Sequence, residues 1–218
     1  TTYYVSAFAT NALGTDYGDT LSFTTDATVP SLTTAAATAI TAATATINGN
    51  ISATGGADLI ASGFEWSVNS DLSSSSDAAA SGTFGDVSAP LTSLAPFTTY
   101  YFSAYATNSE GTAHGDTLDF MTLATVPGAS TLAATDVTHE AASLEGEVTA
   151  TGGSAVTATG FIWGTDPQLA GGASVAGDAL ANAFSAQVAV SPTTTYYVSA
   201  FATNALGTDY GDTLSFTT

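Results

Sequence analysis

The 25 residues from Thr194 to Thr218 read TTYYVSAFATNALGTDYGDTLSFTT, and the same 25 residues open the chain as Thr1 to Thr25. A diverged third copy, TTYYFSAYATNSEGTAHGDTLDFMT, occupies residues 98–122. The copies therefore begin at residues 1, 98 and 194, in steps of 97 and 96 residues. Self-similarity at a nearly fixed step predicts an array of like structural units.

Other landmarks return at the same step and place the limits of each unit. Ala27-Thr28-Val29-Pro30 recurs at residues 124–127, Thr54-Gly55-Gly56 at 151–153, and the Gly-Phe-x-Trp motif of residues 63–66 at 160–163. The sequence therefore predicts three parts: a C-terminal stub of a preceding repeat (residues 1–26) and two whole domains (27–123 and 124–218). The stub contains only the last two strands of a unit, so we expect strands from elsewhere to complete it. Either the preceding part of the same long polypeptide provides them, as the identity of residues 1–25 with 194–218 favours, or a neighbouring subunit does so by strand complementation.

Local sequence patterns within a unit predict strands and no helix. Ala35 to Ile51 is rich in Thr, Ala and Ile and reads as two short strands broken at Asn48-Gly49-Asn50. Further strands are expected at 63–68, 87–94, 99–108 and 117–122, with a long irregular connection over 69–85 that has room for a short edge strand. About seven short strands in each unit predict an all-β, immunoglobulin-like sandwich.

The segment LAPFTTYYFSAYATNSEG, residues 94–111, returns as VSPTTTYYVSAFATNALG at 190–207. It resembles the tyrosine corner and following strand of fibronectin type III domains. The wider pattern is similar to the fibronectin III-like repeats of large bacterial surface proteins. The resemblance implies tandem fibronectin type III-like sandwiches with Tyr100 and Tyr196, and Tyr3 of the stub, in the core.

The core tryptophan departs from the fibronectin type III pattern. That family usually carries it on the second strand, where this chain has Gly49 and Gly146, while Trp66 and Trp163 stand on the third strand. We hypothesise that the two indoles fill the space left by the missing one. Trp66→Ala should then cost about 3–5 kcal/mol, as aromatic truncation in a core does.

Charge and composition exclude several classes of function. The chain has no Lys or Arg, 19 Asp and Glu, and a formal net charge of −19. Nucleic-acid binding is excluded because phosphate neutralisation needs cations, and so is polybasic attachment to anionic lipid. Without Cys there is no disulfide, thiolate nucleophile or Cys zinc site, and no apolar run reaches the ~18–20 residues of a membrane span.

Candidate catalytic residues do not recur between the units. His114 corresponds to Tyr210, and His139 has Ala in the other unit, so no Ser-His-Asp triad is supported. Glu145 and Glu147 share one face of a predicted strand, but Asn stands at both positions in the other unit, which leaves a glycosidase pair without support. We predict no enzymatic activity and no organic cofactor.

Acidic residues do recur in the last loop of each copy. Asp16 and Asp19 in the stub return as Asp209 and Asp212, while Ala113 replaces the first of the pair in the middle copy. Loop carboxylates of this kind bind Ca²⁺ in some proteins. A turn Asp that bonds its own backbone is the simpler interpretation. A calcium site would raise the melting temperature more than Na⁺ of the same ionic strength.

Alternation along the 99–108 strand places a second set of aromatic side chains on the outer face. They are either covered by neighbouring Thr side chains or form an apolar stripe that packs against another subunit or a glycan. The set consists of Tyr4, Phe8, Tyr101, Tyr105, Tyr197 and Phe201.

These observations predict a structural protein: a repeat unit of an extracellular filament, sheath or giant surface adhesin, assembled from like units. An odd number of strands leaves the ends of a domain at opposite poles, and short linkers ending in Pro30 and Pro127 favour a fairly stiff rod. The alternatives are a carbohydrate- or ligand-binding module and a spacer in a secreted enzyme. Asn50-Ile51-Ser52 is a sequon that permits glycosylation at Asn50.

Overall fold

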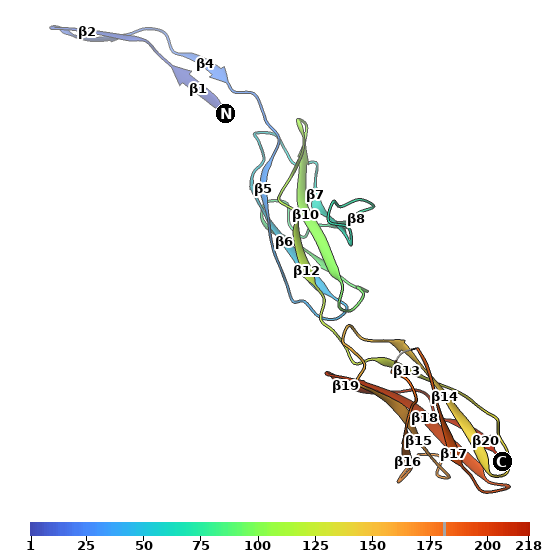
Figure 1. The fold of residues 1–218 in the computed structure, drawn as a ribbon. Helices are drawn as coiled ribbons and strands as arrows, with labels where there is room; N and C mark the ends of the chain where they lie inside the picture. Colours follow the sequence, from blue (N-terminus) through green and yellow to red (C-terminus); the bar gives the residue numbers. More distant parts are fainter. Residues whose placement is uncertain (181) are drawn as a thin grey trace. The chain divides into compact units, whose positions relative to one another are not determined.

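The structure is a computed structural model, and it describes residues 1–180 and 182–218. All regular secondary structure in these residues is β-strand, which confirms the all-β fold class (Figure 1). Within the same residues, no helix is long and apolar enough to cross a membrane.

The first 25 residues form an isolated antiparallel hairpin, here called the N-terminal hairpin. The outer strands pair with each other and the inner strands pair across the loop at Asn11–Gly14. Its strands are β1 (Thr2–Val5), β2 (Phe8–Asn11), β3 (Gly14–Tyr17) and β4 (Leu21–Thr24).

Strands β5–β12 form the first sandwich. One layer has the order β5-β6-β9 and consists of β5 (Ser31–Thr38), β6 (Ala45–Ala53) and β9 (Gly85–Leu91). The other has the order β11-β10-β7-β8, with β12 also paired to β10, and consists of β7 (Ala61–Ser67), β8 (Ser76–Ala79), β10 (Thr99–Asn108), β11 (Gly111–His114) and β12 (Leu118–Met121).

Strands β13–β20 repeat this topology and form the second sandwich. One layer is β13 (Gly128–Thr135), β14 (Ala141–Ala150) and β17 (Ala183–Ala189). The other is β15 (Ala158–Gly164), β16 (Ala173–Ala176), β18 (Thr195–Asn204), β19 (Gly207–Tyr210) and β20 (Leu214–Thr217).

Residue contacts divide the chain into two compact units that meet in sequence between Phe120 and Met121, with the short segments 41–43 and 93–98 belonging to the second. The finer division into 1–26, 27–123 and 124–218 remains a prediction from the repeat. Both units turn at matching places. Ala39 (φ 49°) and Asp136 (φ 48°) are 97 residues apart in the sequence, and both have a left-handed backbone conformation.

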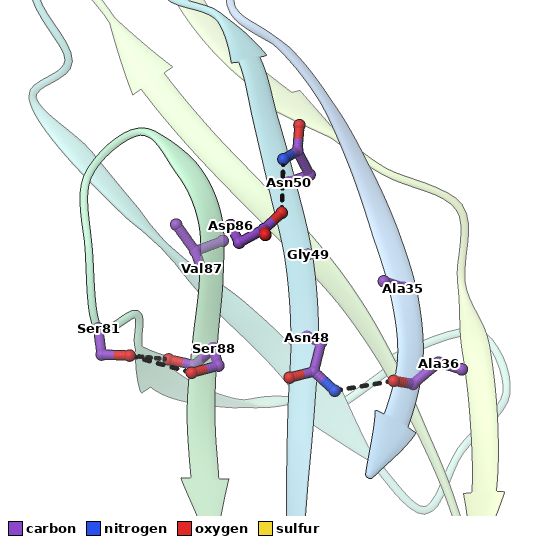
Figure 2. A pocket seen from close by; sticks show the side chains of 9 residues that line it. All are labelled: Ala35, Ala36, Asn48, Gly49, Asn50, Ser81, Asp86, Val87 and Ser88. Carbon is purple, nitrogen blue, oxygen red and sulfur yellow. Dashed lines mark hydrogen bonds between the residues drawn. The ribbon is translucent and has the colours of Figure 1, made fainter.

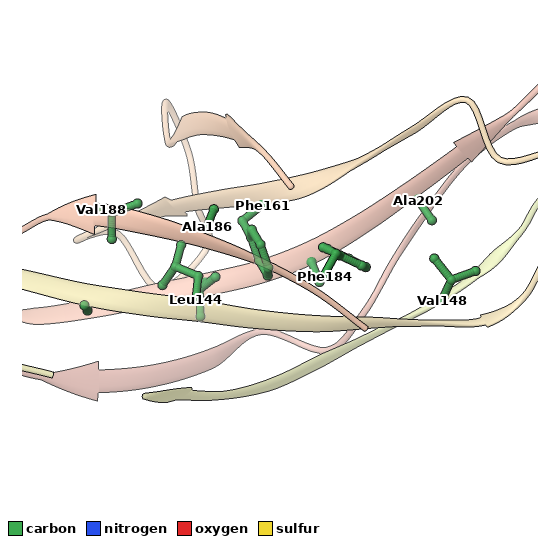
Figure 3. Close-up of a cluster of buried hydrophobic side chains, with 10 residues drawn as sticks. Leu144, Val148, Phe161, Phe184, Ala186, Val188 and Ala202 are labelled. Carbon is green, nitrogen blue, oxygen red and sulfur yellow. The ribbon is translucent and has the colours of Figure 1, made fainter. Parts of the chain in front are cut away.

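Strict alternation along the strands builds each core. On β6, Ala45, Ile47, Gly49 and Ile51 are buried while the residues between them are only partly so. Figure 3 shows the corresponding core of the second sandwich, where Leu144, Phe161 and Phe184 meet between the two layers. Burial of such apolar side chains is the main force that holds the layers together.

The predicted strand break at Asn48-Gly49-Asn50 is wrong. These residues lie in the middle of β6, and the chain instead turns between Thr38 and Ala45, where Ala39 has a positive φ. Gly49 is a packing residue, because a Cβ there would lie 3.0 Å from Ala104 Cβ and 3.4 Å from Phe64 Cε1. A glycine inside a strand marks a close approach as often as a turn.

The hypothesis that the indoles fill the space above these glycines is also wrong. Trp66 and Trp163 are only half-buried and pack against Tyr100 and Tyr196, with ring centroids 5.7 and 5.4 Å apart. Phenylalanine rings occupy the space instead: Phe64 lies over Gly49, and a Cβ on Gly146 would lie 2.7 Å from Phe184 Cζ.

Candidate functional site

The tyrosine corner expected from the sequence is present in the second sandwich. The Tyr196 ring is 8% exposed, and its hydroxyl accepts a 2.9 Å hydrogen bond from the backbone N–H of Ser191. Tyr100 is buried at the matching place, whereas Tyr3 of the N-terminal hairpin is 50% exposed. The corner ties the segment before β18 to the strand itself.

A buried asparagine near the end of each long strand was not singled out by the sequence analysis. Asn204 is 4% exposed, and its Nδ2 donates to the carbonyl oxygens of Thr125 (2.9 Å) and Thr151 (3.1 Å). Its Oδ1 accepts from the backbone N–H of Leu206 at 2.8 Å. Asn108 makes the same set of bonds in the first sandwich. The recurrent Ala-Thr-Asn motif was the available signal.

One outer aromatic side chain in each sandwich lies across a glycine of the neighbouring strand. Tyr105 pairs with Gly63 and Phe201 pairs with Gly160, and a Cβ on Gly160 would lie 2.7 Å from Phe201 Cζ. This cover explains why both rings are only partly exposed. Tyr101 and Tyr197 are likewise partly exposed, but Tyr4 (75%) and Phe8 (69%) of the hairpin are open. A glycan or subunit on this face stays a prediction.

Aromatic pairs also cross from the long strand to the next one. The ring centroids of Tyr105 and His114 are 6.1 Å apart, as are those of Phe201 and Tyr210. His114 Nδ1 lies 3.9 Å from Glu65 Oε2 on the same face. Burial, followed by the negative charges of Asp77 and Glu65, raises the pKa of the Tyr105 hydroxyl. The outer face of the first sandwich is thus partly acidic.

The first acid of each recurrent loop pair accepts a backbone hydrogen bond. Asp209 Oδ2 accepts from the backbone N–H of Ala129 at 3.2 Å, and Asp16 Oδ1 accepts from that of Tyr17 at 3.1 Å. In residues 1–180 and 182–218, no three His, Cys, Asp or Glu side chains gather closely enough to hold a metal. Calcium binding at Asp16 with Asp19, or Asp209 with Asp212, stays a prediction.

The remaining histidine and glutamate candidates are either exposed or hold neighbouring strands together. His139 and Glu140 are exposed neighbours, with His139 Nε2 3.5 Å from Glu140 Oε1. Glu145 Oε1 accepts from the hydroxyls of Thr135 and Ser143, both at 2.9 Å, while Glu147 is exposed. The Glu145 carboxylate therefore links β14 to β13.

A shallow polar recess of about 470 Å³ lies on the outer face of the β5-β6-β9 layer (Figure 2). Asn50 Nδ2 donates to Asp86 Oδ1 at 2.7 Å, and Asn48 Nδ2 donates to the carbonyl oxygen of Ala36 at 2.8 Å. The hydroxyls of Ser81 and Ser88 are 3.0 Å apart at its other side. Amides, hydroxyls and one carboxylate suit a neutral polar ligand.

The recess also bears on glycosylation. Asn50 points into it from the middle of β6 and is half-buried, so a glycan on Nδ2 would have to replace its bond to Asp86. The sequence analysis missed the recess because its residues come from three strands and from the loop before β9. Glycosylation at Asn50 stays a prediction.

The second sandwich has a different arrangement at the matching place. The positions of Asn48 and Asn50 are Glu145 and Glu147, as the repeat aligns them. Asp178 accepts from the backbone N–H of Ser185 at 2.7 Å and from its hydroxyl at 3.0 Å, and these two bonds hold the pKa of Asp178 below its usual value. The first sandwich thus has two amides at these positions, where the second has two carboxylates.

The chain matches no protein-family model and no curated protein sequence. Among solved structures, it is similar to the crystal structure of the FN1–FN3 domains of chicken CNTN1, a contactin, with a TM-score of 0.51 and 16% sequence identity. That alignment covers 88% of this chain and 66% of the contactin fragment. The likeness supports an immunoglobulin-like, fibronectin type III-like β-sandwich fold.

A second solved structure is similar over a shorter length. It is the sensor domain of the anti-sigma factor RsgI4 of Pseudobacteroides cellulosolvens, with 24% identity and a TM-score of 0.37. The alignment covers 44% of this chain and 96% of that domain.

Proposed function

We propose that the chain is a structural section of an extracellular filament, sheath or giant surface adhesin, built from tandem repeats of one sandwich and without enzymatic activity. The observation that carries this proposal is that the repeats match in contacts as well as in residues. Asn108 and Asn204 hold corresponding carbonyl groups, and Thr34 and Thr131 accept the backbone N–H of Ala104 and Ala200, at 3.1 and 2.9 Å.

The path of the chain through the second sandwich supports an array. Thr125, just before the first strand, is bonded to Asn204 at the end of β18, and Thr218, just after the last strand, is bonded to Thr194 next to the start of β18. A strand of this length separates the two points by about 30 Å. A sandwich of this kind receives the chain at one pole and releases it at the other, as a serial scaffold requires.

The chemistry of the surface supports a location outside the cell and association with further copies of the repeat. A chain without Lys or Arg presents no cleavage site to trypsin-like proteases. Two shallow recesses in the described residues are lined by amide, hydroxyl, carboxylate and aromatic groups, and neither contains a histidine. These features favour a scaffold at the cell surface whose partners are further copies of the repeat.

Negative-stain imaging of the native assembly tests this proposal. We expect a regular fibre or layer with an axial repeat that corresponds to one or two sandwiches. Purification of the native protein as a dispersed, catalytically active enzyme would contradict the proposal.

The polar recess favours one alternative, a carbohydrate-binding module. Side-chain amides and carboxylates are the groups that recognise sugar hydroxyls, and here Asn48, Asn50 and Asp86 share one concave face. A glycan array with the full chain tests it, with Asn48→Ala as the variant and Glu145→Ala in the second sandwich as the matched control. Binding that is lost only in Asn48→Ala would favour this module.

A further inference from the structure

The N-terminal hairpin and residues 194–218 have one sequence in two environments, and their internal geometry is the same. Ser6 donates to the carbonyl oxygen of Gly18 at 2.7 Å, and Ser199 donates to that of Gly211 at 2.7 Å. Equal hydroxyl pairs and ring pairs join the strands of both copies. They are Thr10–Thr15 and Thr203–Thr208, both at 2.8 Å, and Tyr3–Phe23 and Tyr196–Phe216, at 5.5 and 5.6 Å between centroids. The hairpin therefore has the internal geometry that the same residues have in a complete sandwich.

The two copies differ in what covers their inner face. Val5 is 52% exposed and Tyr3 is 50% exposed, whereas Val198 and Tyr196 are 1% and 8% exposed. Ala7 and Ala9 are exposed as well, and their counterparts Ala200 and Ala202 are fully buried. The hairpin thus presents an apolar face that the same residues bury in the second sandwich.

The second sandwich identifies the groups that fit this face. Val198 lies in one buried cluster with Leu144 and Phe161, and the Tyr196 ring packs against Trp163. Strands β13–β17 provide these neighbours.

The polar groups of the hairpin need hydrogen-bond partners of the kind that the rest of the second sandwich provides. In the second sandwich, the backbone N–H of Ala200 donates to Thr131 Oγ1, and Asn204 donates to two threonine carbonyl oxygens. Ala7 and Asn11 carry the same donors in the hairpin. A second hairpin packed face to face would cover the apolar side chains but offers no threonine at these places, so it is the poorer partner.

We propose that residues 1–25 are a donor hairpin that binds a five-stranded polypeptide of the kind formed by residues 124–193 and so completes a further sandwich. This inference deepens the proposed function and rests on it for the presence of such five-stranded segments in the same assembly. Strand addition of this kind obtains affinity from main-chain hydrogen bonds and specificity from alternate side chains.

A complementation experiment tests the proposal with the full chain as donor. Isotope-labelled 124–193 is mixed in urea with unlabelled 1–218, and the mixture is diluted into buffer. We expect a 1:1 complex in which the amide spectrum of the labelled fragment becomes dispersed, as in a folded sandwich. The control donor is 26–218, which keeps both sandwiches and lacks the hairpin.

Matched hairpin variants show which face binds. Val5→Asp places a charge on the inner face and should weaken the complex at least ~100-fold. Tyr4→Asp changes the outer face of the same strand and should leave the affinity within about threefold. Both residues lie outside the two sandwiches, so neither variant disturbs their folding.

Three results would overturn the inference. One is a labelled fragment that stays undispersed with 1–218, and another is an equal response to 26–218, which would indicate exchange with the strands of an existing sandwich. The third is a concentration-dependent dimer of 1–218 that needs the hairpin and excludes the fragment, which would identify a second copy as the occupant. Fibre imaging remains a separate test, so loss of complementation alone leaves the scaffold proposal standing.

Discussion

The two sandwiches fill equivalent cores with a phenylalanine placed on different strands. In the first, Phe102 on β10 lies 6.5 Å from Phe64, between ring centroids. In the second, Val198 takes the place of Phe102, and Phe184 on β17 lies 5.2 Å from Phe161 instead. Val87 of the first sandwich corresponds to Phe184 of the second. Each pairs with the glycine of the second strand, Val87 with Gly49 and Phe184 with Gly146.

This exchange shows which property of the core is kept between repeats. One Phe and one Val face the third-strand phenylalanine in both sandwiches, and only their strands are interchanged. Cores tolerate such rearrangement when total volume and pattern are preserved. The glycine on the second strand provides the room in both cases, although the ring that uses it differs.

The largest expected effect is loss of the third-strand phenylalanine. Phe161→Ala should destabilise the second sandwich by about 3–5 kcal/mol, because the ring is fully buried and its removal leaves a cavity. Trp163→Ala should cost less, since that indole is half-buried. Hydrogen exchange at β15 and β18 measures both, with β7 and β10 of the first sandwich as internal control. A larger loss of stability in Trp163→Ala than in Phe161→Ala would show that the indole is the central core residue.

The next largest effect concerns the asparagine that is buried in the second sandwich and exposed in the hairpin. Asn204→Ala removes a buried amide, takes the side-chain donor from the carbonyl oxygen of Thr125 and leaves that of Thr151 with only the 3.4 Å bond from the backbone N–H of Ser154, so we expect a loss of about 2–3 kcal/mol. Asn11→Ala changes the same residue in the hairpin, where it is exposed. Thermal unfolding of both variants should show a lower melting temperature for Asn204→Ala only. A similar decrease in both would show that local turn geometry is the main contribution.

A double-mutant cycle tests the exchanged phenylalanine directly. Phe184→Val leaves a cavity and Val198→Phe overfills the core, so each should cost about 1–3 kcal/mol. The double variant restores the arrangement of the first sandwich and should cost at least about 1 kcal/mol less than the sum. Urea unfolding of the four proteins gives the coupling. Additive costs would show that the two positions do not share space.

Much of the fold was predictable because the strands obey a simple alternation. Thr99–Asn108 was predicted as one strand and is β10 with the same limits, and the tyrosine corner followed from the residues around Tyr196. Gly49 was predicted to lie in a turn because its role depends on the Phe64 ring of another strand. The hypothesis for Trp66 was wrong for the same reason, since contacts between strands decide which ring fills the space. The outer aromatic set was read from alternation along the strand, whereas the position of Tyr105 across Gly63 and of Phe201 across Gly160 depends on register between strands.

The candidate recess was not predictable for a related reason. Asn48 and Asn50 are neighbours by alternation, but Asp86 and Ser88 join them only through the pairing of β6 with β9. Ser81 reaches the same place through a bridge to Ser88 outside the named strands. Concave sites assembled from long-range pairing leave no local pattern in the sequence.

The smallest expected effect is a difference between the outer faces at high pH. Burial and the charges of Asp77 and Glu65 raise the pKa of Tyr105, and the second sandwich has Phe201, which does not ionise, at this place. A raised pKa means that the folded state holds the proton more tightly than the unfolded state, whose tyrosine pKa is about 10. The resulting stability is complete below that pH and is lost as the pH rises through the raised value.

The first sandwich should therefore lose stability above pH ~10 by a term that the second lacks. Tyr105→Phe should remove this term, which hydrogen exchange of the two sandwiches in one sample would detect. Phe201→Tyr is the reciprocal variant, and Ile162 and Ser174 stand there in place of the two carboxylates. It should therefore introduce a smaller pH dependence than the one that Tyr105→Phe removes. An equal effect of the two variants would mean that burial of the ring over Gly63 or Gly160, and not the acidic face of the first sandwich, governs ionisation.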